Sequence, residues 1–110
     1  MHDCFTSTEL LLYELLGFSP EGESKEDIDS GFFELSGRLP VNSDGGPKCF
    51  GHPVGASGLR MTYEVCRQLQ GKALSAERQL KDAKLGISQT FGGPPQVAAV
   101  AVLGKDLRYP

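Results

Sequence analysis

The stretch CFGHPVGASG, residues 49–58, restricts the fold more than any other part of this chain. Pro53 disfavours helical geometry at the preceding residue, His52, and the glycines around it let the backbone pass close to another group. The stretch is therefore expected to be a loop that carries one of the chain's two histidines. A helix expected to start within residues 55–58 would point its N–H groups and positive end at the same place, where an acyl or thioester oxygen could lie near the imidazole. For this loop alone, a glycine-rich turn with a structural histidine is the simpler interpretation.

Apolar spacing predicts two main helices. Residues 6–16 form the first, with a capping box made by Thr6 and Glu9, and Gly17 ends it. The second runs from the glycine-rich loop to about Gln70. The expected apolar faces are Leu11, Leu12, Leu15 and Leu16 in the first helix and Leu59, Tyr63, Cys66 and Leu69 in the second.

Two strands are predicted near the end of the sequence, over residues 83–91 and 96–104, joined by the turn GGPP. The second strand is almost continuous in small apolar residues, which is typical of a strand buried on both faces. Residues 19–37 are acidic and broken by glycines, so we expect at most one short helix there, over residues 25–29. Residues 38–42 are expected to be extended and residues 43–47 to form a turn.

Composition excludes several classes of protein. The chain has 110 residues, enough for one domain, and a net charge of −3, which argues against nucleic-acid binding. It has no apolar run of membrane-spanning length, and its first residues lack the basic region of a signal peptide. Its three cysteines are an odd number in a chain without an export signal. We therefore expect reduced thiols and a cytoplasmic location.

The second histidine lies in the sequence HDCF, where His2 and Cys4 are two residues apart and share one side of an extended segment. Cysteine beside histidine suits thiolate and proton-transfer chemistry, although a buried, inert cysteine is the simpler interpretation of this segment alone. A zinc site is an alternative, because His2 and Cys4 with Cys49 and His52 would supply two thiolates and two imidazoles. Their spacing matches no common zinc finger, so no metal is expected.

Two stretches together resemble the C-terminal catalytic region of the thiolase superfamily. These are VNSDGGPKCFGHPVGASGLR, residues 41–60, and HDCF followed by ELLLYELLGFSPEGE. The first is similar to the Asn-x-x-Gly-Gly approach and Gly-His-Pro-x-Gly-Ala-Ser/Thr-Gly loop of these enzymes. The second resembles the sterol-carrier-protein-x type of thiolase. HDCF distinguishes this type, since most thiolases have Asn-Glu-Ala-Phe at the same place. The resemblance implies an α/β fold that is part of the C-terminal half of the layered thiolase architecture, with two main helices packed on a small mixed sheet.

The resemblance also implies roles for individual residues. His52 matches the histidine that activates a nucleophilic cysteine and contributes to an oxyanion hole. His2 matches a position that helps to hold the thioester oxygen, and Cys4 matches a cysteine suited to the second proton transfer. Thr90 stands where most thiolases have that cysteine, and the backbone N–H of Gly92 is the expected second oxyanion donor. Phe5 is expected to line the acyl or pantetheine channel.

What the resemblance leaves out is equally specific. It covers residues 1–110 but only the last quarter or third of such an enzyme, so the nucleophilic cysteine is expected in an N-terminal half or partner subunit. The implied reaction is thiolysis of a 3-ketoacyl-CoA or the reverse Claisen condensation, with coenzyme A thioesters as substrates, no cofactor, and a homo-oligomeric complete enzyme. The isolated chain is expected to be inactive. The alternatives are a non-catalytic interaction subunit that completes a thiolase partner, and the zinc-binding module.

Overall fold

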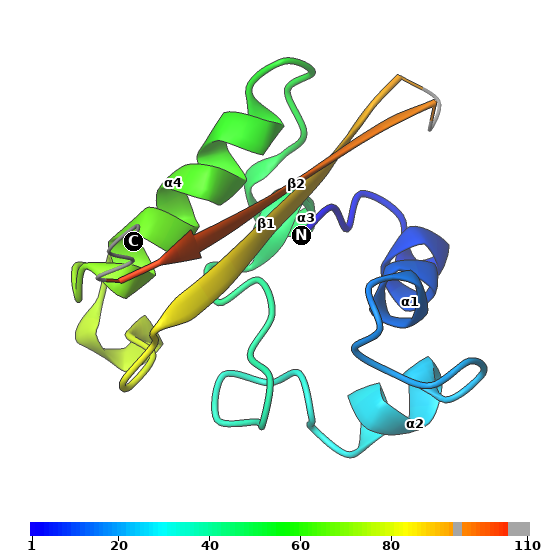
Figure 1. Ribbon diagram of the computed structural model, residues 1–110, viewed down its shortest axis with the longest axis horizontal. Helices are drawn as coiled ribbons and strands as arrows, with labels where there is room; N and C mark the ends of the chain where they lie inside the picture. The colour runs from blue at the N-terminus through cyan, green and yellow to red at the C-terminus, as the bar shows by residue number, and fades with distance from the viewer. Residues whose placement is uncertain (94–95, 106–110) are drawn as a thin grey trace, which may run out of the picture. The chain divides into compact units, whose positions relative to one another are not determined.

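The structure is a computed structural model that describes residues 1–93 and 96–105, and it divides the chain into two compact units. We call residues 2–51 the N-terminal unit and the residues from His52 onward the C-terminal unit. Figure 1 shows the elements of both. The boundary lies inside the glycine-rich loop, directly before His52. Each unit is described by itself.

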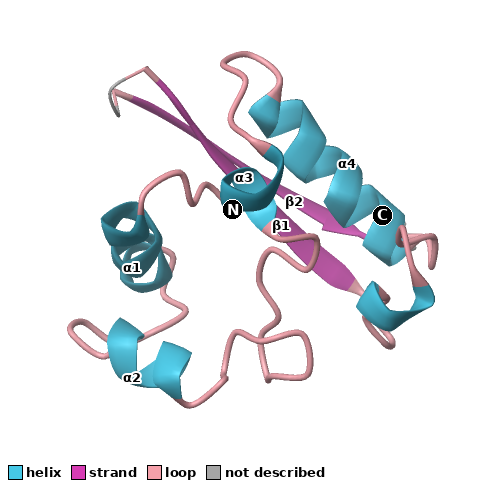
Figure 2. Ribbon diagram, turned by 180° about the vertical axis from the view of Figure 1, so that it is seen from behind, coloured by secondary structure: helices cyan, strands magenta, loops and turns pink. Residues whose placement is uncertain are grey.

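The N-terminal unit contains three short helices: α1 (Thr6–Leu15), α2 (Ser24–Asp29) and α3 (Gly46–Phe50). Helices α1 and α2 pack against each other, as both views show (Figure 2). The apolar centre of this unit is aromatic: the rings of Tyr13 and Phe33 stack with centroids 3.8 Å apart, and Phe32 meets Phe33 edge-on at 5.1 Å. Leu12, Tyr13 and Phe33 are buried.

The first predicted helix is confirmed, but two of its expected details are wrong. Phe5 is the N-cap residue and no side chain caps the helix, because the Glu9 carboxylate bonds to Tyr13 and Lys48 instead of the helix start. Of the expected apolar face only Leu12 is buried, whereas Leu11 and Leu15 are exposed. Gly17 ends the helix as predicted, with a positive φ of 71°.

The rest of this unit follows the predictions for its acidic part. Helix α2 is the one short helix that the sequence predicted. Residues 38–42 form no strand, and the predicted turn at residues 43–47 runs into α3, which the sequence did not predict. Gly45 and Gly46 both have positive φ values, of 98° and 65°, and Pro47 follows them at the start of α3. A glycine pair followed by proline is typical of a turn, so the five-residue helix behind it had no clear signal.

The C-terminal unit is a hairpin with one helix on it. Helix α4 (Ser57–Leu69) packs on β1 (Leu85–Gly92), which pairs antiparallel with β2 (Val97–Gly104) in a register from Leu85↔Gly104 to Gly92↔Val97 (Figure 1). A 3₁₀ turn, η1 (Ala76–Arg78), lies between α4 and β1. The helix and the hairpin are where the sequence predicted them, whereas Pro94 and Pro95 of the expected turn lie outside the described residues.

Small side chains let α4 approach β1 closely. A Cβ at Gly86 would lie 2.5 Å from Cγ1 of Val65, and a Cβ at Gly58 would lie 3.0 Å from Cγ2 of Thr90. The hydroxyls of Thr62 and Ser88 are 3.0 Å apart across the same contact. The α/β class is confirmed. The described strands form an antiparallel pair rather than the expected mixed sheet, and the helix that covers them is α4, while α1 belongs to the N-terminal unit.

Burial in the C-terminal unit differs from the prediction at two places. The buried side of α4 is formed by Ser57, Met61, Gln68 and Leu69, whereas Leu59 and Tyr63 of the expected face are exposed. Strand β2 was predicted to be buried on both faces, but its residues from Val97 to Val102 are exposed. In both cases apolar residues marked surfaces that the described residues of this chain leave uncovered.

Candidate functional site

His52 lies at the start of the C-terminal unit, in a loop whose backbone its neighbours dictate. Gly51 has a φ of 87°, in a region that favours glycine, and Gly55 has a φ of 88°. Between them the carbonyl of Pro53 accepts the N–H groups of Ala56, at 3.0 Å, and Ser57, at 3.2 Å. These bonds fold residues 53–57 into the turn that begins α4. The imidazole, which is exposed, therefore stands just before the N-terminus of a 13-residue helix.

The His52 ring is held by a side chain of its own loop. Nδ1 of His52 is 2.7 Å from Oγ of Ser57, which is buried, and the same hydroxyl donates to the carbonyl of Pro53 at 3.2 Å. In the tautomer that carries its proton on Nδ1, the ring donates to this hydroxyl, which donates its own single proton to Pro53. In that arrangement Nε2 carries the lone pair. The contact with Ser57 is therefore compatible with a ring whose Nε2 can accept a proton.

His2 and Cys4 form a pair in the N-terminal unit. Nε2 of His2 lies 3.1 Å from Sγ of Cys4, within the range of a hydrogen bond to sulfur. His2 is buried, with 4% of its surface exposed, and Cys4 is half-buried. A contact at this distance lets a proton pass between sulfur and imidazole. The sequence prediction that these two residues share one side of their segment is therefore confirmed by their contact.

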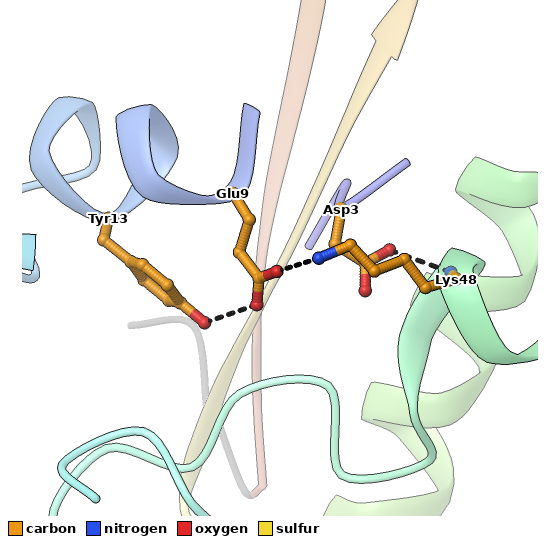
Figure 3. A network of polar contacts seen from close by, with 4 residues as sticks. All are labelled: Asp3, Glu9, Tyr13 and Lys48. Atoms are coloured by element: carbon orange, nitrogen blue, oxygen red, sulfur yellow. Dashed lines mark hydrogen bonds and ion pairs between the residues drawn. The ribbon is translucent and has the colours of Figure 1, made fainter. Parts of the chain in front are cut away.

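A chain of polar contacts leads from Asp3, which lies between His2 and Cys4, to Glu9 and Tyr13 of α1 (Figure 3). The carboxylate of Asp3 accepts the backbone N–H of Lys48 at 3.2 Å. The ammonium of Lys48 pairs with the carboxylate of Glu9, which also accepts the hydroxyl of Tyr13 at 2.9 Å. Burial, this hydrogen bond and the negative charges of Glu9 and Asp3 raise the pKa of Tyr13 above its usual value of 10. The phenol therefore stays protonated and keeps donating.

Gly92 is the last residue of β1 and pairs with Val97. The N–H of Lys105 donates to the carbonyl of Lys84, at 2.9 Å, in continuation of the same ladder. Hydrogen-bonded pairs alternate in an antiparallel ladder, so the pair of Gly92 and Val97 is of the same hydrogen-bonded type. The Gly92 N–H is thus directed at β2 in this register. Thr90, on the same strand, packs against Gly58 of α4.

The remaining candidate residues are placed by the same elements. Phe5 occupies the N-cap position of α1 and is 69% exposed, so it is not a core residue. Cys49 is exposed in α3, and Cys66 is half-buried in α4. In the parts of the chain that are described, residues 1–93 and 96–105, no three His, Cys, Asp or Glu side chains cluster as a metal site would.

The predicted site residues fall into two groups. His2, Cys4 and Phe5 belong to the N-terminal unit, and His52 and Gly92 to the C-terminal unit. Within each unit the structure pairs the histidine with one side chain: Cys4 for His2 and Ser57 for His52. The roles implied for these residues lead us to predict that the two groups meet in one cleft.

Two residues that hold the candidate site escaped the sequence analysis. Ser57 lies five residues after His52, and its spacing inside the glycine-rich loop was a signal that could have been used. Asp3 lies between His2 and Cys4, but its partner Lys48 is 45 residues away. No local pattern in the sequence indicates that contact.

Comparisons with known proteins agree with the resemblance seen in the sequence. A family model described as "Thiolase C-terminal domain-like" matches residues 1–105. The chain is 38% identical over 105 residues to an acetyl-CoA acetyltransferase of Methanothermobacter thermautotrophicus, a match that covers 96% of this chain and 27% of the relative. It is 41% identical over 92 residues to human sterol carrier protein 2, covering 84% of this chain and 16% of that protein.

A third relative is the benzoylsuccinyl-CoA thiolase subunit BbsB of Thauera aromatica, 38% identical over 72 residues, which are 66% of this chain and 19% of that subunit. The chain thus spans about a quarter or less of the length of these three relatives. Within the described ranges, up to Gly93 and from Gln96 to Lys105, no helix is both long and apolar enough to cross a bilayer.

Proposed function

Because this chain belongs to the thiolase C-terminal domain-like family, we propose that it is the C-terminal catalytic portion of a thiolase-like acyl-CoA C-acyltransferase. The match over residues 1–105 carries this proposal, and the two histidine pairs support it. The proposed reaction is the thiolytic cleavage of a 3-ketoacyl-CoA, or the reverse Claisen condensation. The substrates are coenzyme A thioesters, as the names of the acetyltransferase and BbsB relatives suggest.

His52 is the proposed base that activates the nucleophile. Its Nε2 takes the proton of a cysteine thiol that the family resemblance places in an N-terminal half, and the resulting thiolate attacks the 3-keto carbon. The contact of Ser57 with Nδ1 supports this role, because it is compatible with a lone pair on Nε2. The developing oxyanion is then stabilised by N–H donors, of which Nε2–H of the protonated His52 is one.

Cys4 is the proposed second acid and base. When the bond between C2 and C3 of the substrate breaks, the thiol of Cys4 donates a proton to the carbanion of the departing acyl-CoA. The Cys4 thiolate then accepts the proton of the incoming coenzyme A thiol, whose sulfur attacks the acyl carbon of the acyl-enzyme. The bond from that carbon to the nucleophilic cysteine breaks, and the released thiolate takes back its proton from His52. The His2 ring at 3.1 Å from Sγ supports this cycle, because it can hydrogen-bond the sulfur in both protonation states. His2 also helps to hold the thioester oxygen.

Phe5 and Gly92 are the proposed channel residue and the proposed second oxyanion donor. Phe5 is exposed beside Cys4, as a residue that lines an acyl or pantetheine channel should be. Gly92 is the proposed second oxyanion donor, but its N–H is directed at Val97 in the observed register. Its role therefore requires that the end of the hairpin open when substrate is bound.

We further propose that the 110 residues are inactive alone and work with an N-terminal thiolase half in a homo-oligomeric, cytoplasmic enzyme. Neither Cys49 nor Cys66 matches the nucleophile, and Cys4 is assigned to proton transfer. Without an acylated thiolate there is no covalent step for His52 to assist. The alternative, a non-catalytic subunit that only completes a partner, differs in one respect: it would not need Cys4 or His52.

The experiment is reconstitution. The chain is mixed with acetoacetyl-CoA and coenzyme A, with and without an N-terminal thiolase half, and the loss of the 3-keto thioester absorbance is followed. We expect turnover only with that half, and its loss in both Cys4→Ala and His52→Ala. Cys66→Ala is the matched control, a half-buried thiol with no proposed role. Turnover that survives both active-site changes would favour the non-catalytic subunit, and turnover by the chain alone that requires Cys4 would make Cys4 the nucleophile.

A further inference from the structure

Asp3 is a buried carboxylate between the two residues of the His2–Cys4 pair. Only 4% of its surface is exposed. Burial of a carboxylate is costly unless hydrogen bonds compensate for the lost water. One such bond comes from the backbone N–H of Lys48 in α3, at 3.2 Å. The burial of Asp3 therefore depends on its contact with α3.

The backbone of residues 42–46 is shaped around this carboxylate. A Cβ at Gly46 would lie 2.5 Å from Oδ2 of Asp3 and 2.7 Å from Nδ2 of Asn42, closer than real Cβ contacts occur. Any other residue at position 46 would therefore displace the carboxylate or the loop. Gly46, the first residue of α3, thus serves the fit of Asp3 as well as the turn.

Lys48 connects α3 both to Asp3 and to helix α1. The backbone N–H of Lys48 donates to the carboxylate of Asp3, and its ammonium pairs with the carboxylate of Glu9 in α1 (Figure 3). Helix α1 begins at Thr6, so only Cys4 and Phe5 lie between the Asp3 contact and the helix. The segment that carries His2 and Cys4 is thus anchored at Asp3 and again at α1, and both anchors are tied to Lys48.

We propose that Asp3 is the positioning residue of the His2–Cys4 pair. Its carboxylate fixes the segment on α3 so that the His2 ring and the Cys4 sulfur stay in contact, and it touches no substrate itself. The importance of that contact for catalysis rests on the proposed function, whereas the positioning can be measured without turnover.

The test is a double-mutant cycle read by NMR. The chain has two histidines, so the ring signals of His2 and His52 can be followed separately. In the unmodified chain, Cys4→Ala should shift the His2 signal. In the Asp3→Ala background the same change should no longer shift His2, because the pair has lost its geometry. In the Asp3→Asn background the shift should persist, because the amide oxygen can still accept from Lys48.

Asp44→Ala is the matched control. Asp44 is also buried, and its carboxylate accepts the N–H of Gly46 at 2.9 Å in the same loop, but it does not lie between His2 and Cys4. It should leave the coupling of Cys4 to His2 intact. The proposal is overturned if Asp3→Ala keeps the coupling, if Asp44→Ala abolishes it as well, or if Cys4→Ala has no effect on His2 in the unmodified chain. If Asp3→Ala does not fold, Asp3→Asn decides: loss of the coupling there overturns the proposal.

The outcome is separable from that of the proposed function. If Asp3→Ala loses the coupling but the reconstituted enzyme with Cys4→Ala still performs thiolysis, the positioning role of Asp3 is correct and the catalytic role of Cys4 is wrong. If Asp3→Ala keeps the coupling but the reconstituted enzyme with Cys4→Ala is inactive, the catalytic role of Cys4 is correct and the positioning role of Asp3 is wrong.

Discussion

The two histidine pairs differ in how the imidazole is held in place. His52 is exposed and is held by Ser57, five residues further along its own loop. His2 is buried beside Cys4, in a segment held by Asp3 through a contact that spans 45 residues. The geometry of His52 therefore depends on a local turn, whereas that of the His2–Cys4 pair depends on the folding of the whole N-terminal unit. Changes that loosen α3 should damage the second pair and spare the first.

The largest effect is expected from Gly46→Ala, which places a Cβ 2.5 Å from the Asp3 carboxylate at a φ of 65°. Overpacking and the left-handed backbone together should lower the free energy of unfolding of the N-terminal unit by about 2 to 5 kcal/mol. Urea unfolding followed by the His2 signal measures this.

Gly17→Ala is the control, because its φ of 71° is similar and a Cβ there meets nothing within 4 Å. It should cost about 1 to 2 kcal/mol, from the backbone alone. Equal losses in the two variants would show that Asp3 and Gly46 are not closely fitted.

In the C-terminal unit, Gly86→Ala should destabilise the packing of α4 on β1. The new Cβ would lie 2.5 Å from Cγ1 of Val65, a stiff side chain, so we expect a loss of about 1 to 3 kcal/mol. Gly92→Ala on the same strand meets only Cβ of Val97, at 3.8 Å, and should stay within about 0.5 kcal/mol. Thermal unfolding of the two variants compares them, and similar Tm values would contradict the close contact of α4 with β1.

Alkaline pH should weaken the N-terminal unit through Tyr13. Its pKa is raised in the folded state, so below pH 10 both states hold the proton and this group adds no pH dependence. Above pH 10 the unfolded chain releases the proton while the folded chain keeps it, and stability falls by up to about 1.4 kcal/mol per pH unit. Urea unfolding between pH 9 and pH 11 measures the slope. Tyr13→Phe should flatten it, and an unchanged slope would contradict the contact with Glu9.

Ser57→Ala should cost about 1 kcal/mol of stability, because the hydroxyl's bond to His52 and its longer bond to the carbonyl of Pro53 are lost. Its effect on His52 should be larger than this figure suggests, because the ring loses the acceptor at Nδ1. Nitrogen chemical shifts of the His52 ring report the tautomer directly. Ser88→Ala, which removes the hydroxyl bonded to Thr62, is the control and should leave these shifts unchanged. An unchanged tautomer in Ser57→Ala would show that Ser57 does not select it.

The parts of the fold that local sequence determines were predictable. Helix α4 and the hairpin followed from apolar spacing and glycine positions, and the motif residues His52, His2 and Cys4 were found because each motif is contiguous in the sequence. The parts that failed depend on distant partners. Glu9 left the predicted capping box for Lys48, 39 residues away, and α3 lay behind a glycine pair typical of a turn. Apolar residues in β2 predicted burial, but no pattern within one chain says which surface will cover them.

The proposed mechanism requires that the two histidine pairs serve one site. Paramagnetic relaxation tests it most directly in a Cys49→Ser, Cys66→Ser chain that carries a nitroxide on Cys4. The His2 signal must be lost, since its ring touches Cys4, and it serves as the internal control. We predict that the His52 signal is strongly broadened as well and recovers when the label is reduced. A His52 signal of full intensity beside a missing His2 signal would show that the pairs do not share a site, and would contradict the proposed mechanism.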